Sequence, residues 1–178
     1  MNTKKAYKKL ALLLSLAVLN SYSVLLCQEN VLLSIDDMSG YELVNESKVH
    51  WLVSEKNDVH FGIGQQWKII GIDDDIYVYI DYIAFSSATE AMQKTTFNSQ
   101  SYSLPYELGT PTKSVIGDKT WTCVSEKQEQ SDAIIFVKDN IGIKLFIPFY
   151  KGEDLSQRID YISKLILEKI DNYSTNKQ

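Results

Sequence analysis

The feature that most constrains the fold is residues 76–85, where both alternating sets of side chains are largely apolar or aromatic. Successive side chains of a β-strand point to opposite faces of its sheet. A strand that is apolar on both faces is typical of the centre of a sheet that is covered on both sides. One set is Ile76, Val78, Ile80, Tyr82 and Ala84, and the other is Tyr77, Tyr79, Asp81, Ile83 and Phe85.

Two hairpins are predicted: one is formed by this strand and the segment before it, and the other lies later in the chain. Residues 66–72 precede this strand across an acidic turn at residues 73–75. Residues 133–137 and 141–149 flank residues 138–140, where Asp and Asn tolerate the positive φ that tight turns need. Shorter strands are expected at residues 41–44, 48–54, 60–64 and 120–125, after a polar lead-in.

Two helices are predicted, at about residues 87–98 and 154–171. The first begins at Ser87, and Glu90 stands at the spacing of a capping box, in which two side chains satisfy backbone N–H groups of the first turn. Strands, helix, strands and helix in this order predict an α+β fold, an antiparallel sheet built from hairpins with both helices packed on it. The second helix carries an apolar stripe of Leu155, Ile159, Ile162, Ile166 and Ile170.

Residues 1–27 have the pattern of a secretory signal peptide. Lysines at positions 4–9 precede the apolar residues 10–19, and the small residues Ser21 and Ser23 follow. The apolar stretch is shorter than the roughly 20 residues that a membrane-spanning helix needs. We predict export to the periplasm or the medium with cleavage after Ser23. Cleavage after Cys27 and retention as an N-terminal anchor are the alternatives.

Cys27 raises the further alternative of a lipoprotein. It follows Val24, Leu25 and Leu26, although a lipoprotein signal places a small residue where Leu26 stands. Lipidation of Cys27 would tether the exported domain to a membrane. Contact with the membrane is therefore expected only through the leader or through this lipid.

Removal of residues 1–27 leaves about 150 residues, which is enough for one domain. We expect that single domain at residues 28–171 and a disordered polar tail at residues 172–178. The leader holds four lysines and no acidic residue, so its loss takes the net charge from −5 to −9. This charge argues against a nucleic-acid partner. One cysteine, Cys123, then remains, so neither a disulfide framework nor a cofactor is predicted.

Two groups of side chains are candidate sites. The aromatic residues Trp67, Tyr77, Tyr79 and Phe85 would form a surface that stacks against sugars or peptides, unless they form a second buried layer. A weaker candidate is a metal site at Asp73, Asp74 and Asp75. A calcium loop needs alternating ligands and a turn glycine, so a solvated hairpin turn is favoured there.

Catalytic motifs are scarce in the sequence. The two histidines, His50 and His60, lack a zinc spacing, and no G-x-S-x-G occurs. We therefore favour a non-catalytic binding or accessory module whose partner is an envelope protein, a peptide or a glycan. The partner would contact the aromatic face or the loop at residues 101–113. One alternative is a hydrolase using carboxylates such as Asp81 brought together in the fold, and another is an acidic inhibitor of an envelope partner.

The order of elements resembles small exported bacterial domains of unknown function, in which hairpins alternate with helices and an amphipathic helix ends the domain. The segments that carry this resemblance are residues 37–41, residues 116–118 before a Trp-bearing strand, and the hairpin at residues 135–140. The PsbP-like fold is an architectural analogy to the same plan. The resemblance implies an α+β fold and supplies no catalytic residue.

Overall fold

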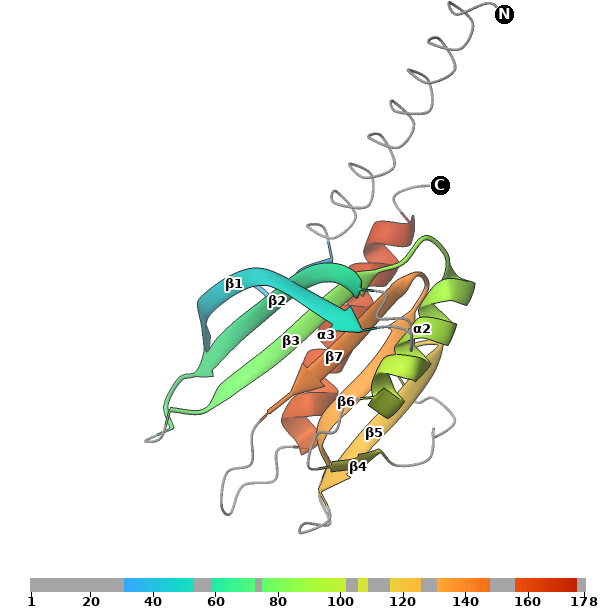
Figure 1. The fold of residues 1–178 in the computed structure, drawn as a ribbon. Coiled ribbons are helices and arrows are strands. Elements are labelled where there is room, and N and C mark those ends of the chain that lie inside the picture. Colours follow the sequence, from blue (N-terminus) through green and yellow to red (C-terminus); the bar gives the residue numbers. More distant parts are fainter. Residues whose placement is uncertain are drawn as a thin grey trace, which may run out of the picture.

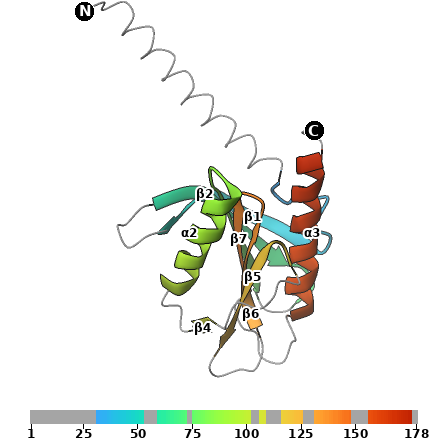
Figure 2. The same cartoon turned by 90° about the vertical axis from the view of Figure 1, so that its right-hand side faces the viewer.

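A computed structural model describes residues 31–52, 59–72, 75–101, 106–108, 116–125, 131–147 and 156–175. In these residues, seven antiparallel strands form one sheet in the order β1-β2-β3-β7-β6-β5-β4, and a helix lies on each face (Figures 1 and 2). The strands are β1 (Tyr41–Leu52), β2 (Val59–Ile69), β3 (Tyr77–Ala84), β4 (Tyr106–Leu108), β5 (Lys119–Ser125), β6 (Ser131–Lys138) and β7 (Ile141–Phe146).

The predicted α+β fold is confirmed. The two helices are α2 (Ala88–Ser101) and α3 (Ser156–Thr175). Helix α3 continues past the predicted end at residue 171, so residues 172–175, which were expected in a disordered tail, are helical. At the start of α2, the backbone N–H of Glu90 donates to Ser87 Oγ at 3.1 Å. The reciprocal bond of the capping box comes from the N–H of Ser86, one residue earlier than predicted, which donates to Glu90 Oε2 at 2.9 Å. Among the described residues, neither helix is long and apolar enough to cross a membrane.

The β2–β3 and β6–β7 hairpins meet through a direct pairing of β3 with β7, which places β3 in the interior of the sheet. Two pairs of predicted short strands are each continuous. The segments at residues 41–44 and 48–54 contribute to β1, which has a bulge between Leu43 and Asn45. The segments at residues 60–64 and 66–72 merge in β2.

One face of the sheet, called here the α3 face, is sealed. Against it pack α3 and residues 31–38, which we call the N-terminal strap. The sequence suggested a polar lead-in here, but Val31, Leu33 and Met38 of the strap are buried in the core. The buried core of this face includes Trp67, Ile69, Val78, Ile80, Tyr82, Phe136, Ile143, Leu145, Ile159, Ile162, Ile166 and Ile170.

The opposite face, called the α2 face, is covered only in part. Helix α2 contacts β6 and β7 and packs over a smaller buried cluster (Figure 2). The predicted cover on both sides of β3 is therefore complete on the α3 face but stops part of the way along the α2 face, where Tyr79 is 37% exposed. The small cluster contains Ile83, Phe85, Ala91, Ala133, Ile135 and Val137.

The end of the β1–β2 hairpin extends to the side of the sheet on which α2 lies (Figure 2). The pairing of β2 with β3 reaches only to Ile63, and Val49 of β1 packs against the α2-face cluster. A Cβ atom on Gly62 would lie 1.9 Å from the carbonyl oxygen of Tyr82. Only glycine permits so close an approach between the two backbones.

Candidate functional site

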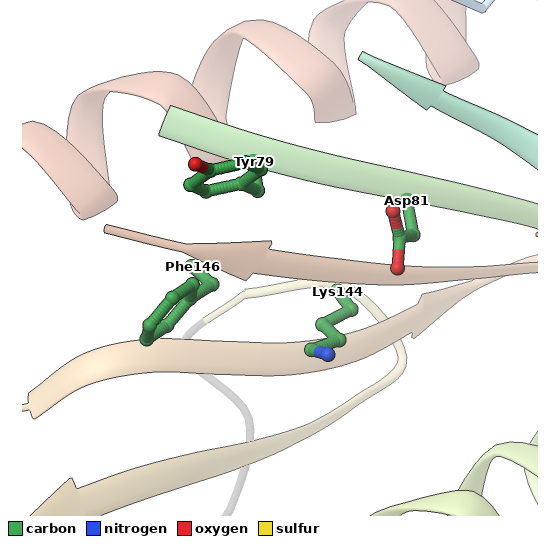
Figure 3. Close-up of a pocket in the computed structure, with 4 residues that line it drawn as sticks. All are labelled: Tyr79, Asp81, Lys144 and Phe146. Atoms are coloured by element: carbon green, nitrogen blue, oxygen red, sulfur yellow. The ribbon is translucent and has the colours of Figure 1, made fainter. Parts of the chain in front are cut away.

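A hollow of about 320 Å³ lies on the uncovered part of the α2 face (Figure 3). The described residues that line it are Tyr79 and Asp81 from β3 and Lys144 and Phe146 from β7. The register of these strands sets Tyr79 opposite Phe146 and Asp81 opposite Lys144. The hollow is therefore made of two cross-strand pairs, an aromatic pair at one end and a charged pair at the other (Figure 3).

The aromatic end is a row of tilted rings. The ring centroids of Tyr79 and Phe146 are 6.1 Å apart, with 32° between the ring planes. Tyr77 continues the row, with its centroid 6.4 Å from that of Tyr79. These separations are within the usual range for interacting aromatic side chains. Since Tyr79 is also among the more exposed large side chains described, the row offers an apolar surface to solvent.

The charged end has a carboxylate, from Asp81, and an ammonium group, from Lys144, at paired positions of neighbouring strands. The side chains of Asp81 and Lys144 are both half-buried. On β2, Gly64 is the register partner of Asp81, and a Cβ atom there would lie 3.0 Å from Asp81 Oδ1. Glycine at this position leaves the space that the Asp81 carboxylate occupies.

Polar side chains extend the hollow toward β1, the edge strand of the sheet. Gln66 of β2 is the register partner of Tyr79, and Asn45 of β1 is the partner of Gln66. Asn45 is exposed and Gln66 is half-buried. We call the hollow and this extension the open platform, which consists of Asn45, Gln66, Tyr79, Asp81, Lys144 and Phe146.

The structure brings together two of the four predicted aromatic ligand-binding residues. Tyr77 and Tyr79 lie side by side on the α2 face. Phe85 lies on the same face but is 1% exposed within the cluster beneath α2. Trp67 has no exposed surface and lies on the α3 face, because its register partner is Val78 rather than a residue of the tyrosine set.

Of the weaker metal candidates, only Asp75 falls within the described residues; Asp73 and Asp74 lie outside them, as does the possible lipidation site Cys27. Asp75 forms an ion pair with Lys68 at 2.5 Å across the β2–β3 hairpin. The hydrogen bond from Lys68 to Asp75, followed by their Coulombic attraction, raises the pKa of Lys68. No group of three metal-binding side chains occurs in the part of the chain that the structure describes.

Lys144 and Phe146 were not predicted as site residues. The apolar alternation of β7 pointed instead to Ile141, Ile143 and Leu145, which lie on the α3 face. The other alternating set of β7 combines a cation with an aromatic ring, and that combination was a usable signal. The sequence did not indicate which strand lies beside β7, because β7 pairs with β3, a segment that is distant in sequence.

Comparison with known proteins gives no match: no family model, no curated protein and no solved structure is significantly similar to this chain. The resemblance to small exported domains and the PsbP-like analogy therefore stay predictions. The function of the open platform has to be inferred from its own chemistry.

Proposed function

We propose that the protein is an exported, non-catalytic domain that binds a ligand on the open platform. The observation that carries the proposal is the hollow beside Tyr79, placed in the interior of a sheet whose other face is sealed. Its volume of about 320 Å³ is near the lower end of the range of small-molecule sites, about 300–1,000 Å³. An exposed aromatic row beside convergent polar groups is the usual composition of such sites.

The strap supports the exported part of the proposal. Val31 has no exposed surface and is part of the core, as is Leu33. Cleavage after Ser23 or after Cys27 would fall before Val31 and would leave this core whole. The product would be periplasmic or secreted, and lipidation of Cys27 would instead hold it at a membrane. The partner would then be an envelope protein, a peptide or a glycan that is accessible outside the cytoplasm.

A photo-cross-linking amino acid at position 79 tests the binding part. The full-length precursor is expressed in its native host with the cross-linker replacing Tyr79, and a matched protein carries it at Tyr161. Tyr161 is also exposed, at 46%, but it lies on α3 on the other side of the sheet. We expect one dominant adduct from position 79 that is absent from position 161 and is reduced by Lys144→Met. Equal adducts from both positions, or no adduct from position 79, would contradict binding on the platform.

Mass spectrometry of the same exported protein tests the processing. We expect an N-terminus at Val24, at Gln28, or at Cys27 with the added mass of a lipid. A protein outside the cytoplasm that still begins at Met1 would contradict cleavage. Recovery of the protein only from the cytoplasm would contradict export.

A further inference from the structure

We infer that the ligand of the open platform is a neutral carbohydrate, with one sugar ring seated in the hollow and the chain running across the strands toward β1. This inference rests on the proposed function and names the ligand class. The hollow presents an apolar surface beside two side chains, Asp81 and Lys144, that can form hydrogen bonds with a ligand. A sugar ring has this same division, with C–H groups on its faces and hydroxyl groups around its edge.

The aromatic end suits the face of such a ring. Tyr79 and Phe146 are tilted by 32° with their centroids 6.1 Å apart, so they form a continuous apolar wall rather than a closed stack. The Tyr79 ring is exposed enough to be covered by a ligand without any change in the fold. Covering it removes apolar surface from water, which favours binding.

The charged end suits the edge of the ring. Asp81 and Lys144 are register partners on β3 and β7, so an acceptor and a donor side chain lie within one small area and their formal charges cancel. Hydroxyl groups on the edge of a sugar ring can donate to the Asp81 carboxylate and accept from the Lys144 ammonium group. A charged ligand would meet one like charge in the hollow, and an anionic polymer would also be repelled by the net negative charge, which is −5 for the full chain and −9 without residues 1–27.

The direction of the chain follows from the register. Asn45, Gln66 and Tyr79 stand in one row across β1, β2 and β3. Adjacent strands are about 4.8 Å apart, so the row extends roughly 10 Å from the hollow to the sheet edge. Each amide offers both a donor and an acceptor, as a second sugar ring requires. In the other direction, the register partner of Phe146 is Ala133 of β6, which is buried, so among the described residues the row continues as an accessible surface toward β1.

A peptide fits the hollow less well. Peptides that bind to sheets commonly add a strand and use the main-chain groups of an exposed edge. Both strands of the hollow are flanked on each side, β3 by β2 and β7, and β7 by β3 and β6. Their main-chain groups are therefore engaged in the ladder, and only side chains face the ligand.

Calorimetric titration tests the inference. The probes are neutral tetrasaccharides of glucose and of N-acetylglucosamine, and the comparison probes are tetra-alanine and an oligomer of galacturonic acid. The full chain is used in a detergent without a sugar headgroup. We expect one of the neutral tetrasaccharides to bind, with an affinity that changes little with salt. Tyr79→Ala should weaken it about tenfold or more, whereas Tyr79→Phe and the opposite-face control Tyr161→Ala should retain it.

The outcomes separate this inference from the proposed function. Failure of both neutral tetrasaccharides to bind overturns the inference. If tetra-alanine or the acidic oligomer binds instead and Tyr79→Ala weakens it, the platform is a binding site for another ligand class, and only the carbohydrate assignment fails. If a neutral tetrasaccharide binds equally well to wild type and to Tyr79→Ala, the ring is not seated in the hollow, and the inference fails. If, in addition, no adduct forms from position 79 in the native host, the proposed function fails with it.

Discussion

The two faces of the sheet differ in how completely they are covered. Helix α3 and the strap seal one face, and the side chains between them and the sheet form the main core. Helix α2 contacts β6 and β7 on the other face and leaves Tyr79 and its neighbours open. We conclude that the molecule draws most of its stability from the α3 face, and that this frees the open half of the α2 face for polar and aromatic side chains that a core would not accept.

The two helices account for the difference. Helix α3 directs a stripe of large side chains at the sheet, including Ile162 and Ile166, which have no exposed surface. The fully buried residues in the described part of α2 are smaller, Ala91 and Thr95, and Met92, which is partly buried, packs against the small cluster. A helix with small contact residues can lie close to a sheet, but it covers less apolar area than a helix with a stripe of isoleucines. The composition of α2 thus limits how far its cover extends.

The strap adds polar contacts that hold the α3 face closed. Asp37 accepts hydrogen bonds from Ser34 N and Oγ at 2.7 and 2.6 Å, and Lys169 of α3 lies 2.8 Å away. Burial alone would raise the pKa of Asp37, but the hydrogen bonds from Lys169 and Ser34 outweigh it and lower the pKa. On the sheet, Gln65 Nε2 donates to the carbonyl oxygen of Leu33 at 2.9 Å. The strap is therefore bonded both to the helix and to the sheet.

The largest effect is expected on the sealed face. Ile166→Ala would remove a fully buried side chain from the middle of α3 and leave a cavity. We expect a loss of about 2–5 kcal/mol in the free energy of unfolding, measured by chemical denaturation. The matched exposed site on the same helix is Tyr161, where Tyr161→Ala should change stability much less. A small effect of Ile166→Ala would break the comparison, because the α3 face would then not be the main source of stability.

Gly62→Ala should have the next largest effect. Gly62 lies on the α2 face, beside Ile83 of the buried cluster that α2 covers. The added Cβ would meet the Tyr82 carbonyl oxygen and the side chain of Ile83, so β2 would have to move away from β3. Overpacking of this kind lowers stability by about 1–3 kcal/mol. Gly71→Asn is the comparison variant: Gly71 has a φ of +86° and a Cβ added there would have no atom within 4 Å, so any loss reflects backbone strain, which Asn keeps small, and not a clash. Equal stability of Gly62→Ala and wild type would show that the two strands do not depend on this close approach.

Much of the fold was predictable because its signals are local. The alternation in residues 76–85, the turn residues around Asp139 and the Ser87–Glu90 spacing each act within a few residues of the chain. Asp139 does adopt the expected positive φ, of 52°. Signals within a few residues of each other decide where strands form, where hairpins turn and where helices begin. The α+β class could therefore be predicted from the sequence.

The site was only half predictable because its geometry depends on register between segments. A shift of one residue in the β2–β3 pairing would move Trp67 to the same face as Tyr79, and no local pattern excludes that shift. Phe146 and Tyr79 belong to two hairpins that α2 and other elements separate in the sequence. Their pairing therefore depends on how the whole sheet assembles. The strap was missed for a related reason: Val31 and Leu33 have no extended periodic pattern around them, and only their tertiary contacts bury them.

Comparison of the pH dependence of stability in wild type and in Glu90→Gln isolates the contribution of the carboxylate at the start of α2. Hydrogen bonds from Lys94 and then from Ser86 lower the pKa of Glu90 to about 2 from its ordinary 4.5. The stabilisation from the charged carboxylate is thus complete above pH 4.5 and is lost as the pH falls from 4.5 toward about 2. We expect a contribution of about 1 kcal/mol, comparable to a helix cap. Glu90→Gln should lower stability at neutral pH and reduce its dependence on pH in this window, measured by denaturation at several pH values. An unchanged pH profile would contradict this role.

The smallest effect on stability is expected where the effect on binding should be largest. Tyr79→Ala removes a side chain that is 37% exposed and stands at the edge of the α2-face cover. We expect a loss of about 1 kcal/mol in the free energy of unfolding, because the ring contacts with Tyr77 and Phe146 are lost while no enclosed cavity is left. Tyr161→Ala is again the matched variant, 46% exposed on the other side of the sheet. If Tyr79→Ala were as destabilising as Ile166→Ala, Tyr79 would serve the core, and the contrast between a sealed face and an open one would fail. A stable Tyr79→Ala protein with a weakened ligand affinity would instead sharpen it, because one side chain would then act in binding with little part in folding.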